Sequence, residues 1–250
     1  MDPAAAWQRA VAMAARGDYS AADRMLVCEP WTTGDPHWQS LALSARGSFR
    51  RQVGDLEAAR ACDERALALA DSALSLADAG IGLAADHVAM GDAVGAHREH
   101  REARSRAIGH WRTLTRWHWV GAEHALLVAD RALATMHADA AARACSGQSA
   151  RHEAKSAIIQ AAVSGRTASL PSVLETLLSH GWDSLMWPLA LVAADHPAGT
   201  DPGWVDAAWV AGRDATYRIG ESLTGDLAGE WRRHPGVLRL RGSTSPTSGE

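Results

Sequence analysis

The chain contains few of the residues that staple secreted proteins or anchor proteins in membranes. Its 250 residues include three cysteines, Cys28, Cys62 and Cys145, which lie far apart and form no CxxC pair. A disulfide framework or a zinc site is therefore not expected, and free thiols in a reducing cytoplasm fit better. The N-terminus lacks the basic start and apolar core of a signal peptide, and no uncharged apolar run reaches the roughly 18 residues of a membrane helix. We expect a cytoplasmic protein with no membrane partner.

An excess of basic charge is also missing. The chain has 29 acidic and 25 basic residues, and its net charge is -4 at pH 7. This balance provides no general positive field that would attract nucleic acid or an anionic membrane. We therefore expect no nucleic acid among the partners.

Motifs that mark common active sites are absent from the sequence. It contains no GxxxxGKS/T or GxGxxG loop for phosphates, no GxSxG turn around a nucleophile and no HExxH zinc motif. The segment HREHRE places His97 and His100 three residues apart, but neighbouring arginines would repel a cation, so we interpret it as a solvated helix face. The sequence predicts no catalytic residues, no metal and no cofactor, and a protein that is not an enzyme.

Most aromatic and β-branched residues are scarce as well. The chain has one Phe and two Tyr beside 11 Trp, and Ala is abundant. Ala has the highest helix propensity, whereas Val and Ile lose rotamer freedom in helices. The composition therefore favours an all-α fold.

A Gly-Asp pair recurs at an equal step. It occurs at Gly17, Gly54 and Gly91, which are 37 residues apart, and an Ala follows five residues after each glycine. Glycine can close a helix in the left-handed conformation, and the aspartate behind it can cap the next helix. The small Ala would let two antiparallel helices approach closely. The pattern predicts the tight turns of stacked helical hairpins.

The second of these units resembles a tetratricopeptide repeat. The residues that carry the resemblance are Gly47, Gly54, Ala59, Ala66 and Leu67, and the match covers roughly residues 4 to 110. The resemblance implies a right-handed α-solenoid in which the first helix of each hairpin lines a concave face. The resemblance also implies a bacterial source. Many bacterial helical-repeat proteins resemble the sensor halves of transcription or signalling regulators.

The rest of the chain is divided by its helical pattern. We predict repeat units over residues 1–165, with turns near 17, 54, 91 and 137. In the fourth unit, residues 110–136 are expected to form one long helix that packs against a partner helix over 149–163. A short helix over 138–145 is expected between the two. Residues 166–232 are expected to form helices that cap the solenoid, with starts near Pro171, Asp183, Asp201 and Leu223. Residues 233–250 are rich in Ser, Thr, Gly and Pro and are predicted to be disordered.

The resemblance implies a set of residues on the concave face. For the second, third and fourth units these are Ser44, Ser48, Arg51 and Gln52; Asp78, Ile81, Ala85 and Ala89; and His124, Leu127, Arg131 and Thr135. This mixed polar and apolar surface suits an extended peptide or a helix of another protein.

Two further constellations are candidates for binding. Arg112, Arg116, Trp119 and Glu123 follow one helical stripe, which either grips an acidic partner or packs its tryptophans in the core with the arginines outside. Behind them, Arg151 and Lys155 share a helix face beside His152, where they either hold a carboxylate or phosphate or simply solvate a surface helix. If Arg112, Arg116 and Arg151 converge, they would form an anion-binding end of the groove.

These patterns support two main functions. The first is a non-catalytic protein–protein interaction module, a scaffold or adaptor that binds another protein or an extended peptide and regulates a transcription or signalling partner. The alternative is a sensor of a small anionic ligand, or an enzyme, with a pocket between the fourth unit and the C-terminal helices. Trp204, Trp209 and Trp231 near the C-terminus form either the patch of a homodimer or part of a core.

Overall fold

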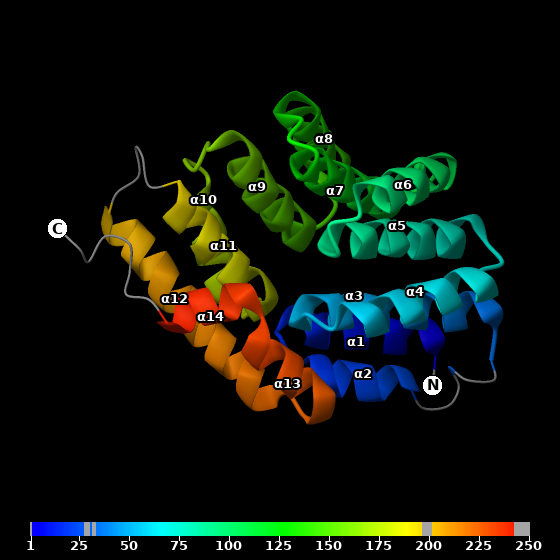
Figure 1. The fold of residues 1–250 in the computed structure, drawn as a ribbon. Helices are drawn as coiled ribbons and strands as arrows, with labels where there is room; N and C mark the ends of the chain where they lie inside the picture. Colours follow the sequence, from blue (N-terminus) through cyan, green and yellow to red (C-terminus); the bar gives the residue numbers. More distant parts are fainter. Residues whose placement is uncertain (1, 28–30, 32–33, 197–201, 243–250) are drawn as a thin grey trace.

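The protein is built from α-helices (Figure 1). A computed structural model describes residues 2–27, 31, 34–196 and 202–242. Within these ranges no strand occurs, which confirms the all-α prediction. The helices are α1 (Pro3–Ala15), α2 (Tyr19–Val27), α3 (Pro36–Val53), α4 (Leu56–Leu69), α5 (Ala73–Ala89), α6 (Ala93–Ala107), α7 (Trp111–Leu127), α8 (Arg131–Cys145), α9 (Ala150–Ser164), α10 (Leu170–His180), α11 (Asp183–Asp195), α12 (Pro202–Ser222), α13 (Gly225–Arg233) and α14 (Pro235–Gly242).

The repeated Gly-Asp pairs are the turns between paired helices, as predicted. Gly17, Gly54 and Gly91 have φ values of 89°, 96° and 76°, in the left-handed region that glycine adopts without a Cβ clash. Each following aspartate caps the next helix, for example Asp92, whose Oδ1 accepts a hydrogen bond from the Gly95 N–H at 2.9 Å.

The alanines behind these turns lie where the two helices of a hairpin cross. Ala22, Ala59 and Ala96 each have 0% of their surface exposed. A larger side chain at these positions would force the paired helices apart, since cores are close-packed.

The fourth turn differs from its prediction. The expected helix over 110–136 is two helices, α7 and α8, which turn at Ala129 rather than near 137. Ala129 takes the left-handed conformation with φ 60°, and Asp130 Oδ1 accepts from the Leu133 N–H at 2.9 Å. The Asp cap is kept while Ala replaces Gly, so the joint was hidden from a search for glycine. His137 lies inside α8 and is buried.

The C-terminal helices follow the sequence pattern except at the end of the chain. Helix α10 ends at Gly181, which has φ 64°, and α11 has the predicted bounds. The predicted cap Asp201 lies outside the described residues. Residues 235–242 were expected to be disordered but form α14, because Val237 and Leu240 are fully buried against neighbouring helices.

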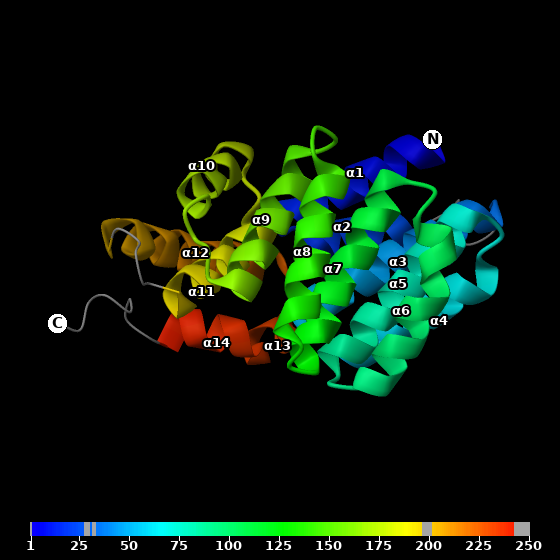
Figure 2. The same cartoon turned by 90° about the horizontal axis from the view of Figure 1, so that it is seen from above.

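The helices close into a ring. The inner helices α1, α3, α5, α7, α9 and α11 contact one another in this order, and α11 in turn contacts α1. Figure 2 shows the same arrangement from above. The C-terminal helices complete the closure, because α13 packs on α3 and α12 on α2. The molecule is therefore repeat-like but closed upon itself.

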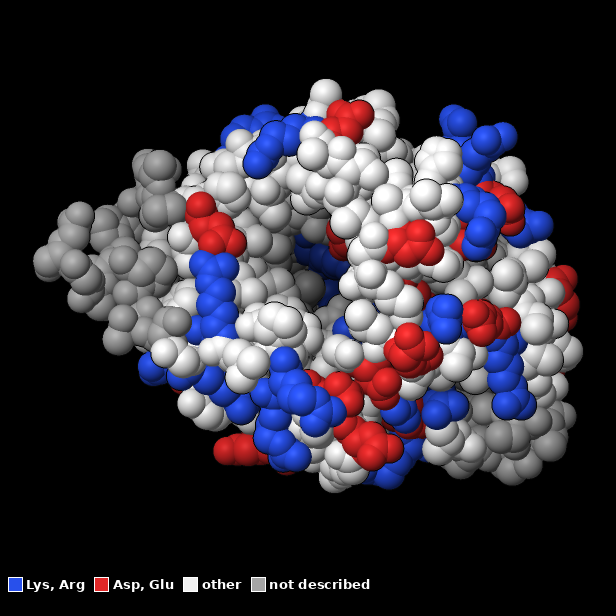
Figure 3. All heavy atoms as spheres, in the orientation of Figure 1, with Lys and Arg blue, Asp and Glu red and all other residues white. Residues whose placement is uncertain are grey.

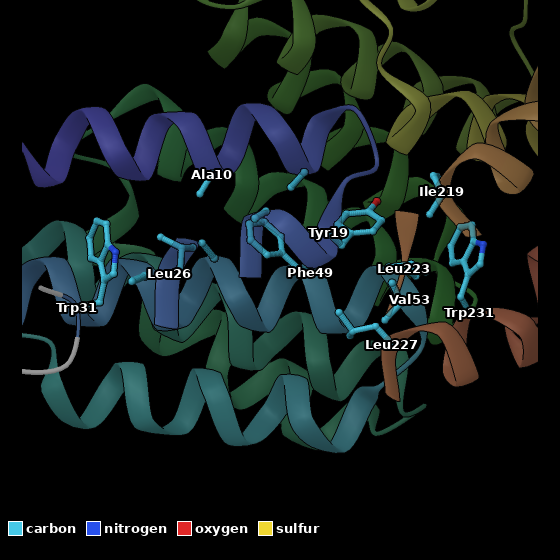
Figure 4. Packing of buried hydrophobic residues seen from close by; sticks show 14 of the residues in the cluster. Ala10, Tyr19, Leu26, Trp31, Phe49, Val53, Ile219, Leu223, Leu227 and Trp231 are labelled. Atoms are coloured by element: carbon cyan, nitrogen blue, oxygen red, sulfur yellow. The ribbon is translucent and has the colours of Figure 1, made fainter. Parts of the chain in front are cut away.

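The closing contact has its own core. Ile219, Leu223, Leu227 and Trp231 from the C-terminal helices belong to one buried cluster with residues of the first hairpins, among them Tyr19, Phe49 and Val53 (Figure 4). Separate clusters fill the middle hairpins. The first hairpin thus depends for its burial on the last third of the chain.

Two expectations from composition can be compared with the described residues. Cys62 and Cys145 are free thiols, as expected, whereas Cys28 lies outside the described ranges. None of the helices in the described ranges combines the length and apolarity needed to cross a bilayer.

Candidate functional site: a cationic central cavity

The ring of inner helices encloses a cavity of about 520 Å³. The first helix of each hairpin lines it, as the resemblance implied. All four residues expected from the second unit and all four from the third line its wall. Figure 3 shows the face into which it opens, with Lys and Arg atoms deep in the hollow. A cavity of this size suits a small organic ligand.

The fourth hairpin contributes other residues than its predicted set. Helix α7 ends at Leu127, and its inner face presents Arg112, Arg116, Trp119 and Glu123 to the cavity. These four residues are the helical stripe that was predicted separately as a binding candidate. Arg131 begins α8, is exposed and does not line the cavity. His124, Leu127 and Thr135 do not line it either.

Nine of the ten candidate binding residues meet in this one cavity. They are Arg51, Gln52, Arg112, Arg116, Trp119, Glu123, Arg151, His152 and Lys155. The sequence left open whether Arg112, Arg116 and Arg151 converge. In the structure all three line the same cavity. Five of the lining side chains are cationic, against two lining carboxylates, Asp78 and Glu123.

Asp78 pairs with two of these cations. Arg112 and Arg116 both donate to its carboxylate, which is 2% exposed. Burial alone would raise the pKa of Asp78, but the two guanidinium groups outweigh it and hold the pKa below its usual range. Arg112 also lies 5.0 Å from the centre of the Trp7 ring.

Arg51 is neutralised from the other side of the wall. It donates to Asp86 at 2.7 Å and approaches Asp63 at 3.4 Å. Both carboxyl groups are fully buried, and burial raises their pKa values above the usual range despite the nearby guanidinium. Asp63 fits there because Gly47 and Gly82 leave room, since a Cβ at either position would lie within 2.6 Å of its carboxyl group.

Arg151 has no such counter-ion. Its Nη2 donates to Ser184 Oγ at 3.2 Å, its Nε has no hydrogen-bond partner, and no carboxylate of the described residues lies within ion-pair distance. Burial lowers its pKa. The nearby Tyr19 hydroxyl lies beside Ser184 but makes no hydrogen bond of good geometry, and burial raises its pKa. A half-buried cation and a buried hydroxyl thus line the cavity with unused hydrogen-bonding capacity.

Lys155 lies one helical turn beyond Arg151. Its Nζ is 4.3 Å from the centre of the Trp119 ring. The ring is held in place by a hydrogen bond that Trp119 Nε1 donates to Ser156 Oγ at 2.9 Å. Lys155 forms no ion pair or hydrogen bond with the residues that the structure describes. Burial, followed by the charges of Arg151, Arg116 and Arg51, lowers the pKa of Lys155 to about 8, although Glu123 opposes this shift.

His152 completes the group around Trp119. Its ring stacks on Trp119 at 5.2 Å and meets Trp111 edge-on at 5.0 Å. Burial and the neighbouring cations lower its pKa to about 3. His152 is therefore neutral at physiological pH and adds a flat polar wall rather than charge.

Sequence reasoning missed two features of the site. Tyr19 and Ser184 were not singled out, and no local motif marks them. The stronger missed signal is a count: Lys155 is the one lysine in the chain, whereas 24 arginines make up the other basic residues.

The interpretation of HREHRE as a solvated face needs correction. His97 is exposed, but His100 is buried and stacks on Trp117 at 4.2 Å. His118 and His137 pack beside it, with their Nδ1 atoms 2.9 Å apart. Among the described residues, no group of three or more His, Cys, Asp or Glu is arranged to hold a metal ion.

The sequence was also compared with known proteins. No family model and no curated protein matches it. The function must therefore be argued from the cavity itself.

Proposed function

We propose that this protein binds a small organic anion in its central cavity. The observation that carries the proposal is Arg151, a half-buried guanidinium whose solvent-shielded Nε has no hydrogen-bond partner and which has no carboxylate partner among the described residues. A buried charge is costly unless it is paired. An anionic ligand would supply the missing partner, and Tyr19 and Ser184 lie where they can donate to the same anion.

The other cations favour the same end of the cavity. Arg112 and Arg116 already share Asp78, and Arg51 is held by Asp86, so each of the three has a carboxylate partner within the wall. Arg151 and Lys155 remain as the groups that an incoming anion would neutralise. They lie at i and i+4 on α9, with Cβ atoms about 5–6 Å apart.

The remaining wall suits an organic body rather than an inorganic ion. Trp7, Phe49, Ile81, Val88 and Trp187 line the cavity beside the cations. Apolar and aromatic walls with a few convergent polar groups are typical of small-molecule sites. The ligand we propose therefore carries a carboxylate or phosphate on an apolar or aromatic body.

A protein partner is the second candidate. The cavity opens to solvent (Figure 3), so an acidic side chain of a partner could enter it and take the place of the free anion. This reading keeps the tetratricopeptide-like scaffold that regulates a signalling partner. Closure of the ring by α12–α14 favours the small ligand, because an extended peptide needs an open groove.

Thermal unfolding in the presence of anions tests the proposal. We expect a panel of carboxylates and organic phosphates, at constant ionic strength, to contain compounds that stabilise the wild type. A ligand present at 100 times its Kd adds about 2.7 kcal/mol to the free energy of unfolding. Calorimetry would then give the affinity and stoichiometry.

Two arginine variants make the test specific. Arg151→Met should abolish stabilisation, whereas Arg131→Met removes an exposed arginine outside the cavity and should leave it unchanged. Equal binding by both variants would place the anion elsewhere. A panel without any stabilising anion, together with capture of a protein that Arg151→Met loses, would favour the protein partner.

A further inference from the structure

The lone lysine of the chain is inside the cavity. Lys155 Nζ lies over Trp119, among Arg51, Arg116 and Arg151, whose charges all act on it. The other 24 of the 25 Lys and Arg residues are arginines. The choice of lysine at this one position therefore calls for a property that arginine lacks.

Attraction of an anion is not that property. Arginine offers a planar fork of donors that matches a carboxylate better than an ammonium group does. Arginine, however, stays protonated and does not act as a nucleophile, whereas a lysine in an apolar site near other cations can lose its proton and attack carbon. Lys155 has this environment, since it is enclosed, lies on an aromatic face and has no ion-pair partner among the described residues.

We propose that Lys155 forms an imine with a carbonyl-bearing organic anion, with 2-oxo acids as the class that fits best. This inference rests on the proposed anion-binding function. Arg151, one turn away on the same face of α9, would hold the carboxylate. In a 2-oxo acid the carbonyl carbon is bonded directly to the carboxylate, which places it next to the Lys155 amine.

The reaction requires no group beyond these side chains and the ligand. The neutral amine attacks the carbonyl carbon, and the carbon–oxygen double bond becomes a single bond. Glu123, the carboxylate that acts on Lys155, accepts a proton from the new ammonium nitrogen and returns it to the oxygen that departs as water. The two hydrogens of the amine leave in that water, a carbon–nitrogen double bond remains, and no atom is oxidised or reduced.

The environment places the reactive form of the amine near neutral pH. Because the pKa of Lys155 is lowered to about 8, a sizeable fraction of the amine is unprotonated between pH 7 and 8. His152 stays neutral there and does not compete for the anion as a second cation. An ordinary lysine, with a pKa near 10.4, would be almost wholly protonated at the same pH.

Reductive trapping tests the proposal directly. Wild-type protein is incubated with pyruvate and cyanoborohydride, which converts an imine to a stable secondary amine, and the adduct is located by peptide mass mapping. We expect one adduct, on Lys155. Because the chain has a single lysine, only the N-terminal amine competes, and the mapping separates the two.

Matched ligands and variants define the site. Dihydroxyacetone phosphate tests whether a phosphate can replace the carboxylate, and acetone offers a carbonyl without charge. Acetone should label Lys155 at least tenfold more slowly than the preferred anion. Lys155→Arg should give no internal adduct, Arg151→Met should slow trapping at least tenfold, and Arg131→Met should trap like the wild type.

The outcomes separate this inference from the proposed function. Lactate has the carboxylate of pyruvate without its carbonyl, so it should stabilise the protein and slow trapping by competition. Stabilisation by lactate or pyruvate with no adduct on Lys155 would overturn the imine and leave the anion site standing. Equal labelling of Lys155 by acetone and pyruvate would also overturn the inference, because the cavity would then select no anion.

Discussion

The hydroxyl of Ser222 donates a hydrogen bond to the carbonyl oxygen of Gly17 at 3.2 Å, which joins residues 205 positions apart. Gly17 is thus both a hairpin turn and part of the closing contact of the ring. A Cβ at Gly17 would lie 2.4 Å from Ile219 Cγ1, whereas a Cβ at the equivalent turn Gly91 would meet nothing within 4 Å.

This difference gives a matched pair of variants. Gly91→Ala should lower the free energy of unfolding by about 0.5–1 kcal/mol, because the strain of about 1–2 kcal/mol for an L-residue in the left-handed conformation exceeds the gain of about 0.4–1 kcal/mol from a stiffer unfolded chain. Gly17→Ala should lose about 1–3 kcal/mol more, because Ile219 must also move. Urea unfolding would measure both, and equal losses would show that the ring does not close tightly at this turn.

Removing Arg151 should separate stability from binding. Arg151→Met takes away a half-buried cation that has no carboxylate partner among the described residues, so the free energy of unfolding should stay the same or rise. Arg112→Met leaves the buried Asp78 with one guanidinium instead of two and should cost about 1–3 kcal/mol. Denaturant unfolding of the two variants without ligand checks this, and an equal loss in both would mean that Arg151 is already compensated.

The buried histidine group should make stability depend on pH. Burial is the main reason why the pKa values of His100, His118 and His137 are lowered to about 4. The unfolded chain has histidine pKa values near 6.5, so it binds more protons than the folded protein between about pH 6.5 and 4. The contribution of these histidines to stability is therefore complete above pH 6.5 and is lost as the pH falls through this window.

Urea unfolding between pH 7.5 and 4.5 would measure this slope. His118→Gln should flatten it by up to about 1.4 kcal/mol per pH unit, since one linked proton is removed. His180→Gln replaces an exposed histidine of α10 and should leave the slope unchanged. A slope that is the same in all three proteins would assign the acid sensitivity to other groups. Asp63 and Asp86 are not among them, because carboxyls whose pKa values are raised by burial favour the folded state as the pH falls.

Ala129 offers a stabilising change. It is exposed and has φ 60°, where the other three turns of this kind have glycine. Ala129→Gly relieves about 1–2 kcal/mol of backbone strain and loses about 0.4–1 kcal/mol to the freer unfolded chain, so we expect a net gain of about 0.5–1 kcal/mol. Ala132→Gly, at an exposed position in α8, should instead lose about 0.5–1 kcal/mol. Thermal melts of both would show opposite signs, and a loss in both would contradict the assigned turn.

Local chemistry made the hairpins predictable. A glycine that ends one helix and an aspartate that caps the next are read directly from neighbouring residues, as at Gly54 and Asp55. The stripe of Arg112, Arg116 and Trp119 was likewise predicted from helical spacing, although the helix around it was drawn too long. The fourth turn was missed because Ala129, rather than a glycine, takes the left-handed conformation there, although Asp130 still caps the next helix.

Features that depend on distant parts of the chain were beyond the sequence. The pairing of Asp78 with Arg112 spans 34 positions, and nothing near Asp78 announces it. The closure of the ring and the order in α14 arise from burial against helices far away in sequence. From the sequence, the central cavity could be stated only as a hypothesis. It forms because α11 contacts α1, and this contact between distant parts of the chain has no local sequence signal.

Because the ring closes on its first hairpin, the helices that are synthesised first are among the last to be fully buried. The ribosome releases α1–α3 well before Ile219 and Trp231, which complete the apolar cluster around Tyr19 and Phe49. The middle hairpins α5–α6 and α7–α8 have local clusters of their own and can fold as they emerge. The apolar side chains of α1–α3 therefore stay partly exposed until the C-terminal helices have been synthesised.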